Sequence, residues 1–243
     1  MRRLVSSLGI IDHEAKAFWI VDASPDIGEQ VDLLLSSDRS YRLAGILLTH
    51  AHIGHYLGLA FLGRESLNTR DLPVLCTMRM TTFLSENQPW KQLVDLNNIA
   101  LTMIEPGASV KLTSSVAVTP ILVTHRDELS DTVAFVISGP AKQLVYCPDI
   151  NHWEGPILEA IEGADIALLD GTFYSADELP GRDISKIPYP PVAGSMQAFA
   201  GTKAAIHFTH LNHTNRLLSD ERLVRYVSSL GFGIAVRGQR HTL

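Results

Sequence analysis

Short apolar runs typical of buried strands alternate with helical spacing of apolar residues over the first half of the chain. Pro25 is expected at the first position of a helix, with Asp26 and Glu29 in its first turn. The expected strands cover 18–21, 45–48 and 72–76, and the expected helices cover 25–35, 54–62, 80–84 and 90–96. This alternation predicts a layered α/β structure with right-handed crossovers.

From residue 99 the period changes to that of strands, and turn residues separate the runs. Strands are expected over 99–104, 109–112, 116–123, 132–138 and 143–147. This block is predicted to be mostly antiparallel. A mixed block follows, with helices near 156–161, 195–200 and 220–230 and strands over 166–169, 204–208 and 233–236. The proline-rich segment from Pro180 to Pro191 is either a functional loop or a plain surface excursion.

Length and composition indicate an ordinary globular protein. A chain of 243 residues, 46% hydrophobic and 19% charged, is predicted to form a single domain over 1–243. The net charge of −6 and the scattered basic residues argue against a nucleic-acid partner. No window approaches a membrane span, so no membrane partner is expected. Cys76 and Cys147 are too few for a disulfide framework, which favours the cytoplasm, although a mature periplasmic form would look the same.

The strongest chemical signal is a cluster of histidines directly after the apolar run 44–48. His50, His52 and His55 lie within six residues, at the point where a predicted strand ends in a loop. Neutral imidazole is the commonest metal ligand in proteins, so His50 and His52 can converge on one ion while His55 faces a neighbouring point. The alternative is a histidine cluster on the surface with no ligand.

Three more residues with metal-binding side chains follow predicted strands. His125 comes after 118–123, Asp149 after 144–147 and His210 after 204–208. Each alone is more typical of a cap or turn residue. Because sites in α/β sheets gather at the carboxyl ends of strands, these residues together with the histidine cluster predict one site.

The order of these residues resembles the metallo-β-lactamase superfamily, whose pattern is an early Asp, His-x-His-x-Asp-His, a later His, a later Asp and a final His. The matching residues are Asp22, His50, His52, His55, His125, Asp149 and His210. The resemblance implies an αββα sandwich, with two mixed β-sheets face to face and helices on the outer faces. The metal cleft would lie along one edge.

The same resemblance implies the ligands of two metal ions. His50, His52 and His125 would hold one ion, and His55 and His210 would hold the second. Asp149 would bridge both ions. Asp22 would hold the histidine loop by hydrogen bonds rather than touch metal. Asp170 would either support the ligands in a similar way or close a turn after its strand.

Further segments resemble one branch of the superfamily, which includes coenzyme PQQ synthesis protein B and phosphodiesterase-like members. These segments are 22–27, 170–173 and 210–215. The chain is expected to lack the opening strand and glycine-rich turn of that branch. Transfer-RNA-processing relatives carry a His-Glu pair where this chain has Leu169 and Asp170, so the resemblance argues against a nuclease.

One position departs from the superfamily pattern. The aspartate before the last histidine of the triplet is Gly54 here, and glycine has no side chain to coordinate a metal. We therefore expect one tightly bound and one labile ion, unless Asp127 or Glu128 supplies the missing oxygen ligand.

These residues favour a metal-dependent hydrolase that uses a metal-bound hydroxide on a small-molecule ester, lactone, amide or phosphoester. Zinc is the expected metal, and iron and manganese remain open. Asp149 would orient the hydroxide, and His213, Tyr174 or the second ion would polarise the substrate oxygen. A hydrogen-bonded turn is an equally good interpretation of His213, because Asn212 and Asn215 flank it.

Two other functions fit the same residues. The resemblance also implies an iron-dependent oxygenase-like role in cofactor biosynthesis, and Gly54 allows a non-catalytic metal-binding member. Among the remaining histidines, His207 is expected in the core or behind the ligands. His13, His152 and His241 are expected at the surface. The substrate does not follow from the sequence, and a homo-oligomer remains open.

Overall fold

The computed structural model describes residues 3–36, 38–178 and 189–243, which form two compact units. Unit 1 consists of residues up to Val116 together with Asp127–Asp131. Unit 2 consists of Ala117–Arg126 and the residues from Thr132 onward. The proline-rich segment of the sequence lies mostly outside the described residues, which resume at Tyr189.

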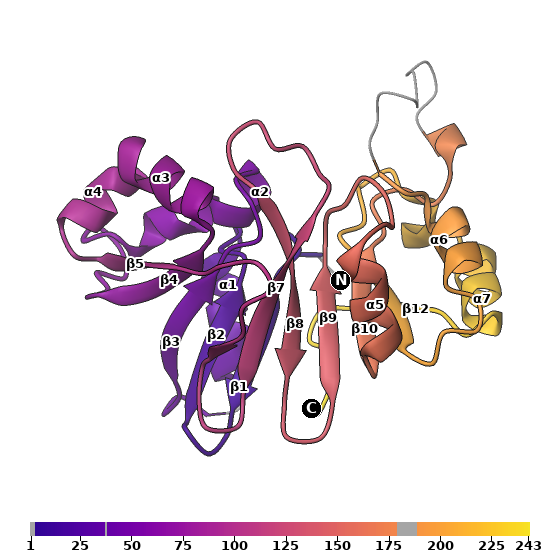
Figure 1. The fold of residues 1–243 in the computed structure, drawn as a ribbon, viewed down its shortest axis with the longest axis horizontal. Coiled ribbons are helices and arrows are strands. Elements are labelled where there is room, and N and C mark those ends of the chain that lie inside the picture. Colours follow the sequence, from indigo (N-terminus) through magenta and orange to yellow (C-terminus); the bar gives the residue numbers. More distant parts are fainter. Residues whose placement is uncertain (1–2, 37, 179–188) are drawn as a thin grey trace. The chain divides into compact units, whose positions relative to one another are not determined.

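Unit 1 contains a five-stranded sheet in the order β1-β2-β3-β4-β5 (Figure 1). Its strands are β1 (Leu8–Asp12), β2 (Ala17–Val21), β3 (Arg42–Leu47), β4 (Leu72–Cys76) and β5 (Ile99–Met103). β1 pairs antiparallel with β2, and the other neighbours pair in parallel. Every residue of β2 is buried, which explains its continuous apolar sequence.

Helical segments connect these strands. They are α1 (Ile27–Leu35), α2 (Ile53–Tyr56), the 3₁₀ helix η1 (Leu57–Leu62), α3 (Met78–Glu86) and α4 (Trp90–Asp95). A short strand β6 (Val110–Lys111) follows β5. The apolar core of the unit gathers residues of β2, β3, β4 and these helices.

Unit 2 carries its strands in the order β12-β11-β10-β9-β8-β7. Their bounds are β7 (Ala117–Val123), β8 (Thr132–Ser138), β9 (Gln143–Cys147), β10 (Ile166–Asp170), β11 (Ala205–Thr209) and β12 (Gly233–Ile234). The pairs β7·β8 and β8·β9 are antiparallel. The pairs from β9 to β12 are parallel, so the carboxyl ends of β9, β10 and β11 lie at the same edge.

The helical segments of unit 2 are α5 (Pro156–Gly163), η2 (Ala176–Glu178), α6 (Val192–Ala198), η4 (Arg216–Leu218) and α7 (Glu221–Ser229). The side chain of Asp220 caps α7 by accepting hydrogen bonds from the backbone of Arg222 and Leu223. Such a cap stabilises a helix by about 1 kcal/mol.

Most elements lie where the sequence predicts them, but several details differ. The helix expected over 54–62 is divided into α2 and η1, and β12 is shorter than expected. Strand β1 was not predicted. α1 begins at Ile27, so Pro25 precedes the N-cap residue Asp26 rather than opening the helix. β5 belongs to the parallel sheet of unit 1 and not to the antiparallel block, because α3 and α4 supply the crossover that a parallel pair needs. α6 begins at Val192, earlier than expected.

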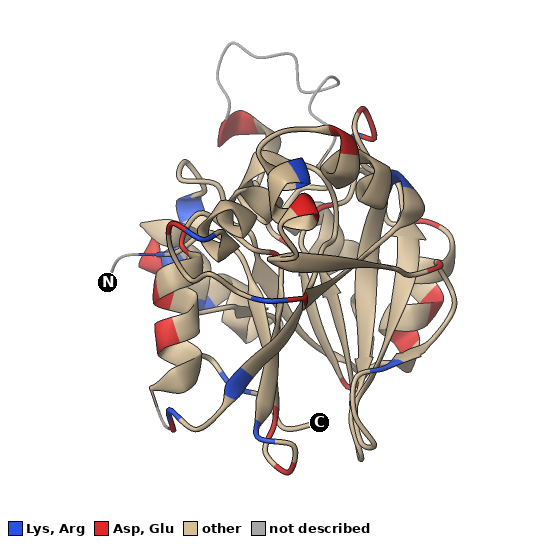
Figure 2. Ribbon diagram, turned by 90° about the vertical axis from the view of Figure 1, so that its left-hand side faces the viewer, with Lys and Arg blue, Asp and Glu red and all other residues tan. Residues whose placement is uncertain are grey.

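The distribution of charged residues and the length of the apolar helices bear on possible partners. Figure 2 shows Lys and Arg as well as Asp and Glu distributed over several helices and connecting segments. Among the helices that the structure describes, none is long and apolar enough to span a bilayer.

Candidate metal centre

The three clustered histidines of unit 1 lie in the loop after β3 and in the following helix α2. The rings of His50 and His52 have centroids 4.5 Å apart, and those of His50 and His55 are 4.3 Å apart. His50 and His55 are buried, whereas the His52 side chain is 28% exposed. Three imidazoles from one short segment are therefore gathered in one place, as the spacing predicted.

Asp22 supports this loop from the end of β2. Its carboxylate accepts hydrogen bonds from the backbone nitrogen of Thr49 at 2.9 Å and from the Thr49 hydroxyl at 2.9 and 3.0 Å. It also contacts His55 Nδ1 at 2.8 Å. The side chain is fully buried, and its backbone has a φ of 68°. A left-handed conformation of a non-glycine residue is rare and is typical of functional sites.

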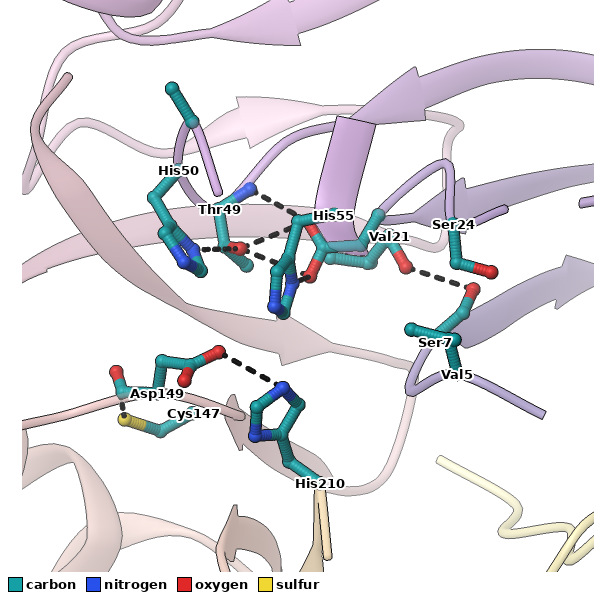
Figure 3. A network of polar contacts seen from close by, with 12 residues as sticks. Val5, Ser7, Val21, Ser24, Thr49, His50, His55, Cys147, Asp149 and His210 are labelled. Atoms are coloured by element: carbon teal, nitrogen blue, oxygen red, sulfur yellow. Dashed lines mark hydrogen bonds and ion pairs between the residues drawn. The ribbon is translucent and has the colours of Figure 1, made fainter. Parts of the chain in front are cut away.

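Unit 2 brings together the other three predicted ligands at the carboxyl edge of its sheet. His125 follows β7, Asp149 follows β9 and His210 follows β11. One carboxylate oxygen of Asp149 lies 3.7 Å from Nε2 of His125, and the other lies 3.4 Å from Nε2 of His210. Figure 3 shows Asp149 and His210 facing each other. Asp149 thus directs its two oxygens at two different histidines.

These separations fit the chemistry of a metal site. Two ligand atoms of one tetrahedral zinc ion, each about 2.0–2.2 Å from it, lie roughly 3.4 Å apart. Imidazole nitrogen and carboxylate oxygen form a donor set that suits zinc, iron or manganese. The residues of unit 2 therefore fit a bound divalent metal ion.

Four of the five candidate histidines, His50, His55, His125 and His210, have Nδ1 in contact with an oxygen atom. His55 contacts Asp22, and His50 Nδ1 lies 2.9 Å from the Thr49 hydroxyl (Figure 3). His125 Nδ1 lies 3.0 Å from the Asn151 side-chain oxygen, and His210 Nδ1 lies 3.1 Å from the Thr172 hydroxyl. Oxygen acceptors at Nδ1 orient metal-binding histidines and leave Nε2 for the metal.

Asp170, at the end of β10, is fully buried beneath the ligands of unit 2. It accepts hydrogen bonds from the Ile150 backbone at 3.2 Å and from the Thr172 backbone and hydroxyl, each at 2.7 Å. Burial, and then the charge of Asp149, raise its pKa well above the usual value. Burial likewise raises the pKa of the neighbouring Cys147 thiol, followed by the charges of Asp170 and Asp149. The thiol is therefore protonated and unreactive.

Several neighbours of the ligands were not singled out as site residues from the sequence. Thr49, Thr172 and Asn151 contact the rings of three predicted ligands, and Asn215 holds the turn after β10 through bonds to the Gly171 and Thr172 carbonyls. In the sequence, the position of Thr49 next to His50 was the one indication that such a residue contacts a histidine ring. The others become visible only when separate strands are paired.

The ring of Tyr189 lies between two neighbours in unit 2, His125 and Phe173. The ring centroid of Tyr189 lies 5.4 Å from that of His125 and 6.0 Å from that of Phe173. Burial, and then the charges of Asp149 and Asp170, raise the pKa of Tyr189. An apolar wall next to a ligand limits the access of water and offers a surface for part of a substrate.

The segment 127–131 belongs to unit 1 and approaches the histidine loop. Ser130 Oγ accepts a hydrogen bond from the Ala51 backbone at 2.8 Å. Glu128 lies 3.9 Å from Nε2 of His52, whereas Asp127 pairs with Arg79 at 3.6 Å. Of the two carboxylates considered as substitutes for a ligand at Gly54, Glu128 is thus the one beside a histidine of the loop.

Gly54 itself has room for a side chain. It lies in α2, and its φ is not among the positive values of the chain. A Cβ built there would meet only Val5 Cγ1, at an ordinary 3.7 Å. Gly54 is therefore not required for a positive φ, and a side chain is compatible with its backbone.

The remaining candidates lie elsewhere. His213 is exposed in the loop after β11 and forms no hydrogen bond or ion pair within the described part of the chain. Tyr174 lines a cavity of about 410 Å³ with residues of α6 and α7. His207 and His241 have ring centroids 5.3 Å apart, so His241 is not the isolated surface residue expected.

Comparison with known proteins agrees with this arrangement. Residues 19–214 match a family model described as beta-lactamase superfamily domain. The chain belongs to the metallo-β-lactamase superfamily. Coenzyme PQQ synthesis protein B from Nitrosococcus oceani is 27% identical over 90% of this chain and 82% of its own length. The same protein from a Methylobacterium species is 27% identical over 99% and 88%. The chain therefore lies in the branch of that protein.

Solved structures confirm the predicted α/β metallo-β-lactamase fold. Zinc-bound PqqB from Methylobacterium extorquens matches 99% of this chain and 88% of its own, with a TM-score of 0.84 and 20% identity. A diphosphatase of the PhnP family matches 96% and 82%, with a TM-score of 0.70 and 20% identity. At these identities the likeness establishes the fold alone.

Proposed function

We propose that this protein is a metal-dependent hydrolase that cleaves an ester, lactone, amide or phosphoester bond of a small molecule. The observation that carries the proposal is the position of Asp149, whose two oxygens face Nε2 of His125 and of His210 at distances typical of shared metal ligands. Membership of a superfamily that includes hydrolases supports it.

The ligands follow from the superfamily pattern. We propose that His50, His52 and His125 hold one ion, that His55 and His210 hold a second, and that Asp149 contacts both. Zinc suits this donor set, and zinc is bound in the related PqqB structure. Because Gly54 removes an oxygen ligand, the second ion is the weaker one. Glu128 lies beside His52, a ligand of the first ion, and so does not replace that oxygen ligand at the second.

A metal ion held by these residues would supply Lewis acidity and would lower the pKa of bound water from about 15.7 towards about 7. The protein residues then have separate tasks. The Asp149 carboxylate accepts a hydrogen bond from the attacking water and so orients it towards the substrate. His213, at the exposed loop after β11, donates a hydrogen bond to the reacting oxygen of the substrate. Tyr189, which packs against Phe173, shields His125 from bulk water on one side.

Buried thiols favour the cytoplasm as the location. Cys76 and Cys147 are free and buried, and neither belongs to a disulfide. A reducing compartment is consistent with both.

The test combines metal analysis with a substrate panel. Protein purified without chelators is analysed by plasma mass spectrometry and assayed on esters, lactones, amides and phosphodiesters before and after metal removal. We expect zinc to be retained, turnover to disappear with chelation and turnover to return when zinc is restored. Metal-dependent melting without turnover of any substrate class would contradict the hydrolase and favour a non-catalytic metal-binding protein.

A second function is favoured by the relatives. Identity of 27% over most of the chain links it to coenzyme PQQ synthesis protein B. Histidine and carboxylate ligands also suit iron, so an oxygenase-like step in cofactor biosynthesis is the alternative. Iron as the retained metal, with oxygen uptake that depends on it, would favour this alternative. Zinc as the retained metal without oxygen uptake would favour the hydrolase.

A further inference from the structure

We propose that Thr49 and Thr172 are positioning residues whose hydroxyls fix the ring tautomers of His50 and His210, so that Nε2 of each ring carries the lone pair. This inference rests on the proposed metal site. It assigns a task to two threonines that the superfamily pattern of ligands does not include.

Each relay is a chain of hydrogen bonds from an aspartate through a threonine hydroxyl to a histidine ring. The first relay consists of Asp22, Thr49 and His50. The Thr49 hydroxyl has one hydrogen, and it lies 2.9 and 3.0 Å from the two oxygens of the buried Asp22 carboxylate. A carboxylate only accepts, so the hydroxyl donates its hydrogen to Asp22. The oxygen of Thr49 is then an acceptor for His50 Nδ1 at 2.9 Å (Figure 3). His50 must carry its hydrogen on Nδ1, which leaves the lone pair on Nε2.

The second relay has the same parts in the other unit. Asp170 accepts from the Thr172 hydroxyl at 2.7 Å, and that hydroxyl lies 3.1 Å from Nδ1 of His210. The Thr172 and Ile150 backbone nitrogens also donate to Asp170. With donors directed at both of its oxygens, Asp170 is arranged as an acceptor. The hydroxyl therefore receives the hydrogen of His210 Nδ1.

The type of residue supports this task. Threonine is branched at Cβ, which restricts the side-chain rotamer and so fixes the direction of the hydroxyl. In both relays the backbone nitrogen of the same threonine also donates to the aspartate. Two hydrogen bonds from the same threonine therefore fix the position of its hydroxyl relative to the carboxylate. The same arrangement occurs at two histidines that come from different strands, one in each unit.

Replacing each hydroxyl by a methyl group tests the relay. Thr49→Val and Thr172→Val keep the shape and the backbone hydrogen bond but remove the acceptor. Long-range proton–nitrogen correlation spectra of metal-free protein at about pH 8, where imidazoles are neutral, report the tautomer of each ring. We expect hydrogen on Nδ1 of His50 and His210 in the wild type, and a mixture with Nε2 hydrogen at the affected ring in each variant.

Zinc affinity provides a second readout. Loss of a group that orients a metal-binding histidine typically lowers affinity by about 10–100-fold, and we expect a loss in this range for each valine variant. Thr49→Ser and Thr172→Ser should restore most of it. Thr132→Val is the matched control, because Thr132 is buried and its hydroxyl has no hydrogen-bond partner among the described residues.

The outcomes separate the relay from the proposed function. Valine variants that keep the wild-type tautomers and bind zinc within about twofold of wild type would overturn the relay. Hydrogen on Nε2 of His210 in the wild type, donated through Thr172 from a protonated Asp170, would also overturn it there. A wild type that binds no zinc would refute the metal site, while the tautomer spectra still test the threonines. If Thr49→Val fails to fold, the wild-type tautomer of His50 still tests the first relay, because hydrogen on its Nε2 would overturn it, and the Thr172 variants test the second.

Discussion

At the scale of single residues, the site depends on the oxygen atom behind each imidazole. Four rings have Nδ1 within 2.8–3.1 Å of a carboxylate, hydroxyl or amide oxygen. Asp22 and Asp170, which contact three of these rings directly or through a threonine hydroxyl, are fully buried. Metal affinity therefore depends on these oxygen atoms as well as on the ligands.

Replacing one ligand should remove the ion that it holds. We expect His52→Ala to lower zinc affinity by at least about 100-fold and to lower the melting temperature in the presence of zinc, because metal binding is linked to folding. Isothermal titration and thermal melting measure both effects. The exposed His152→Ala is the control. A His52→Ala protein with wild-type zinc affinity would show that His52 is not a ligand.

Restoring the aspartate that the superfamily pattern contains should tighten the weaker ion. We expect Gly54→Asp to retain a second ion through mild chelation that removes it from the wild type, because the backbone at this position accepts a side chain. Gly54→Ala adds the Cβ without the carboxylate and should leave ion retention unchanged. Equal retention in the wild type and in Gly54→Asp would contradict a labile second ion.

The sequence indicates the ligands better than their supports. Spacing and strand ends are sufficient to single out His50, His125 and Asp149 as candidates, because those side chains have few other reasons to share a pattern. Thr172 and Asn151 are ordinary residues after strands, and their task depends on which strand is paired beside them. Pairing is a tertiary property that no local pattern carries.

At the scale of elements, apolar periodicity predicts that a strand or helix exists and where it begins and ends. It does not predict which neighbouring strand a given strand pairs with. β8 and β9 have the bounds expected from the sequence, because turn residues separate their apolar runs. β5 was wrongly assigned to the antiparallel block, because an apolar segment of this length is compatible with either parallel or antiparallel pairing. β1 was missed because Leu8–Asp12 is short, contains Gly9 and is only partly buried.

Strand β11 carries a titrating group away from the proposed ligands. Gln239 Nε2 lies 3.3 Å from His207 Nδ1 and 3.1 Å from His241 Nε2. Burial, and then the charge of His241, lower the pKa of His207, while burial and Lys142 lower that of His241. The folded state therefore binds fewer protons than the unfolded state as the pH falls below the ordinary value of 6.5.

The contribution of His207 and His241 to the free energy of unfolding is therefore fully present above pH 6.5. It is lost as the pH falls from 6.5 through the lower pKa values that the two side chains have in the folded state. We expect His207→Gln to flatten the fall in the free energy of unfolding between about pH 6.5 and 5. Denaturant unfolding of metal-free protein at several pH values measures this, with His152→Gln as the control. An unchanged slope in His207→Gln would contradict the contribution of this pair.

At the scale of the whole molecule, each compact unit supplies half of the proposed ligands. Unit 1 contributes His50, His52 and His55, and unit 2 contributes His125, Asp149 and His210. If the same ions bind both sets, metal binding favours the folded chain as a whole. Chelation should then lower the melting temperature of both units together. Melting of one unit alone on chelation would contradict shared ions.

The most direct test of a shared ion is a double-mutant cycle between the units. Zinc affinity is measured for the wild type, His52→Ala, His125→Ala and the double variant. If both histidines hold the same ion, each single variant loses most of the affinity and the double variant loses much less than the sum of the two free-energy changes. Additive losses in the double variant would show that His52 and His125 bind separate ions, and the proposed metal centre would be wrong.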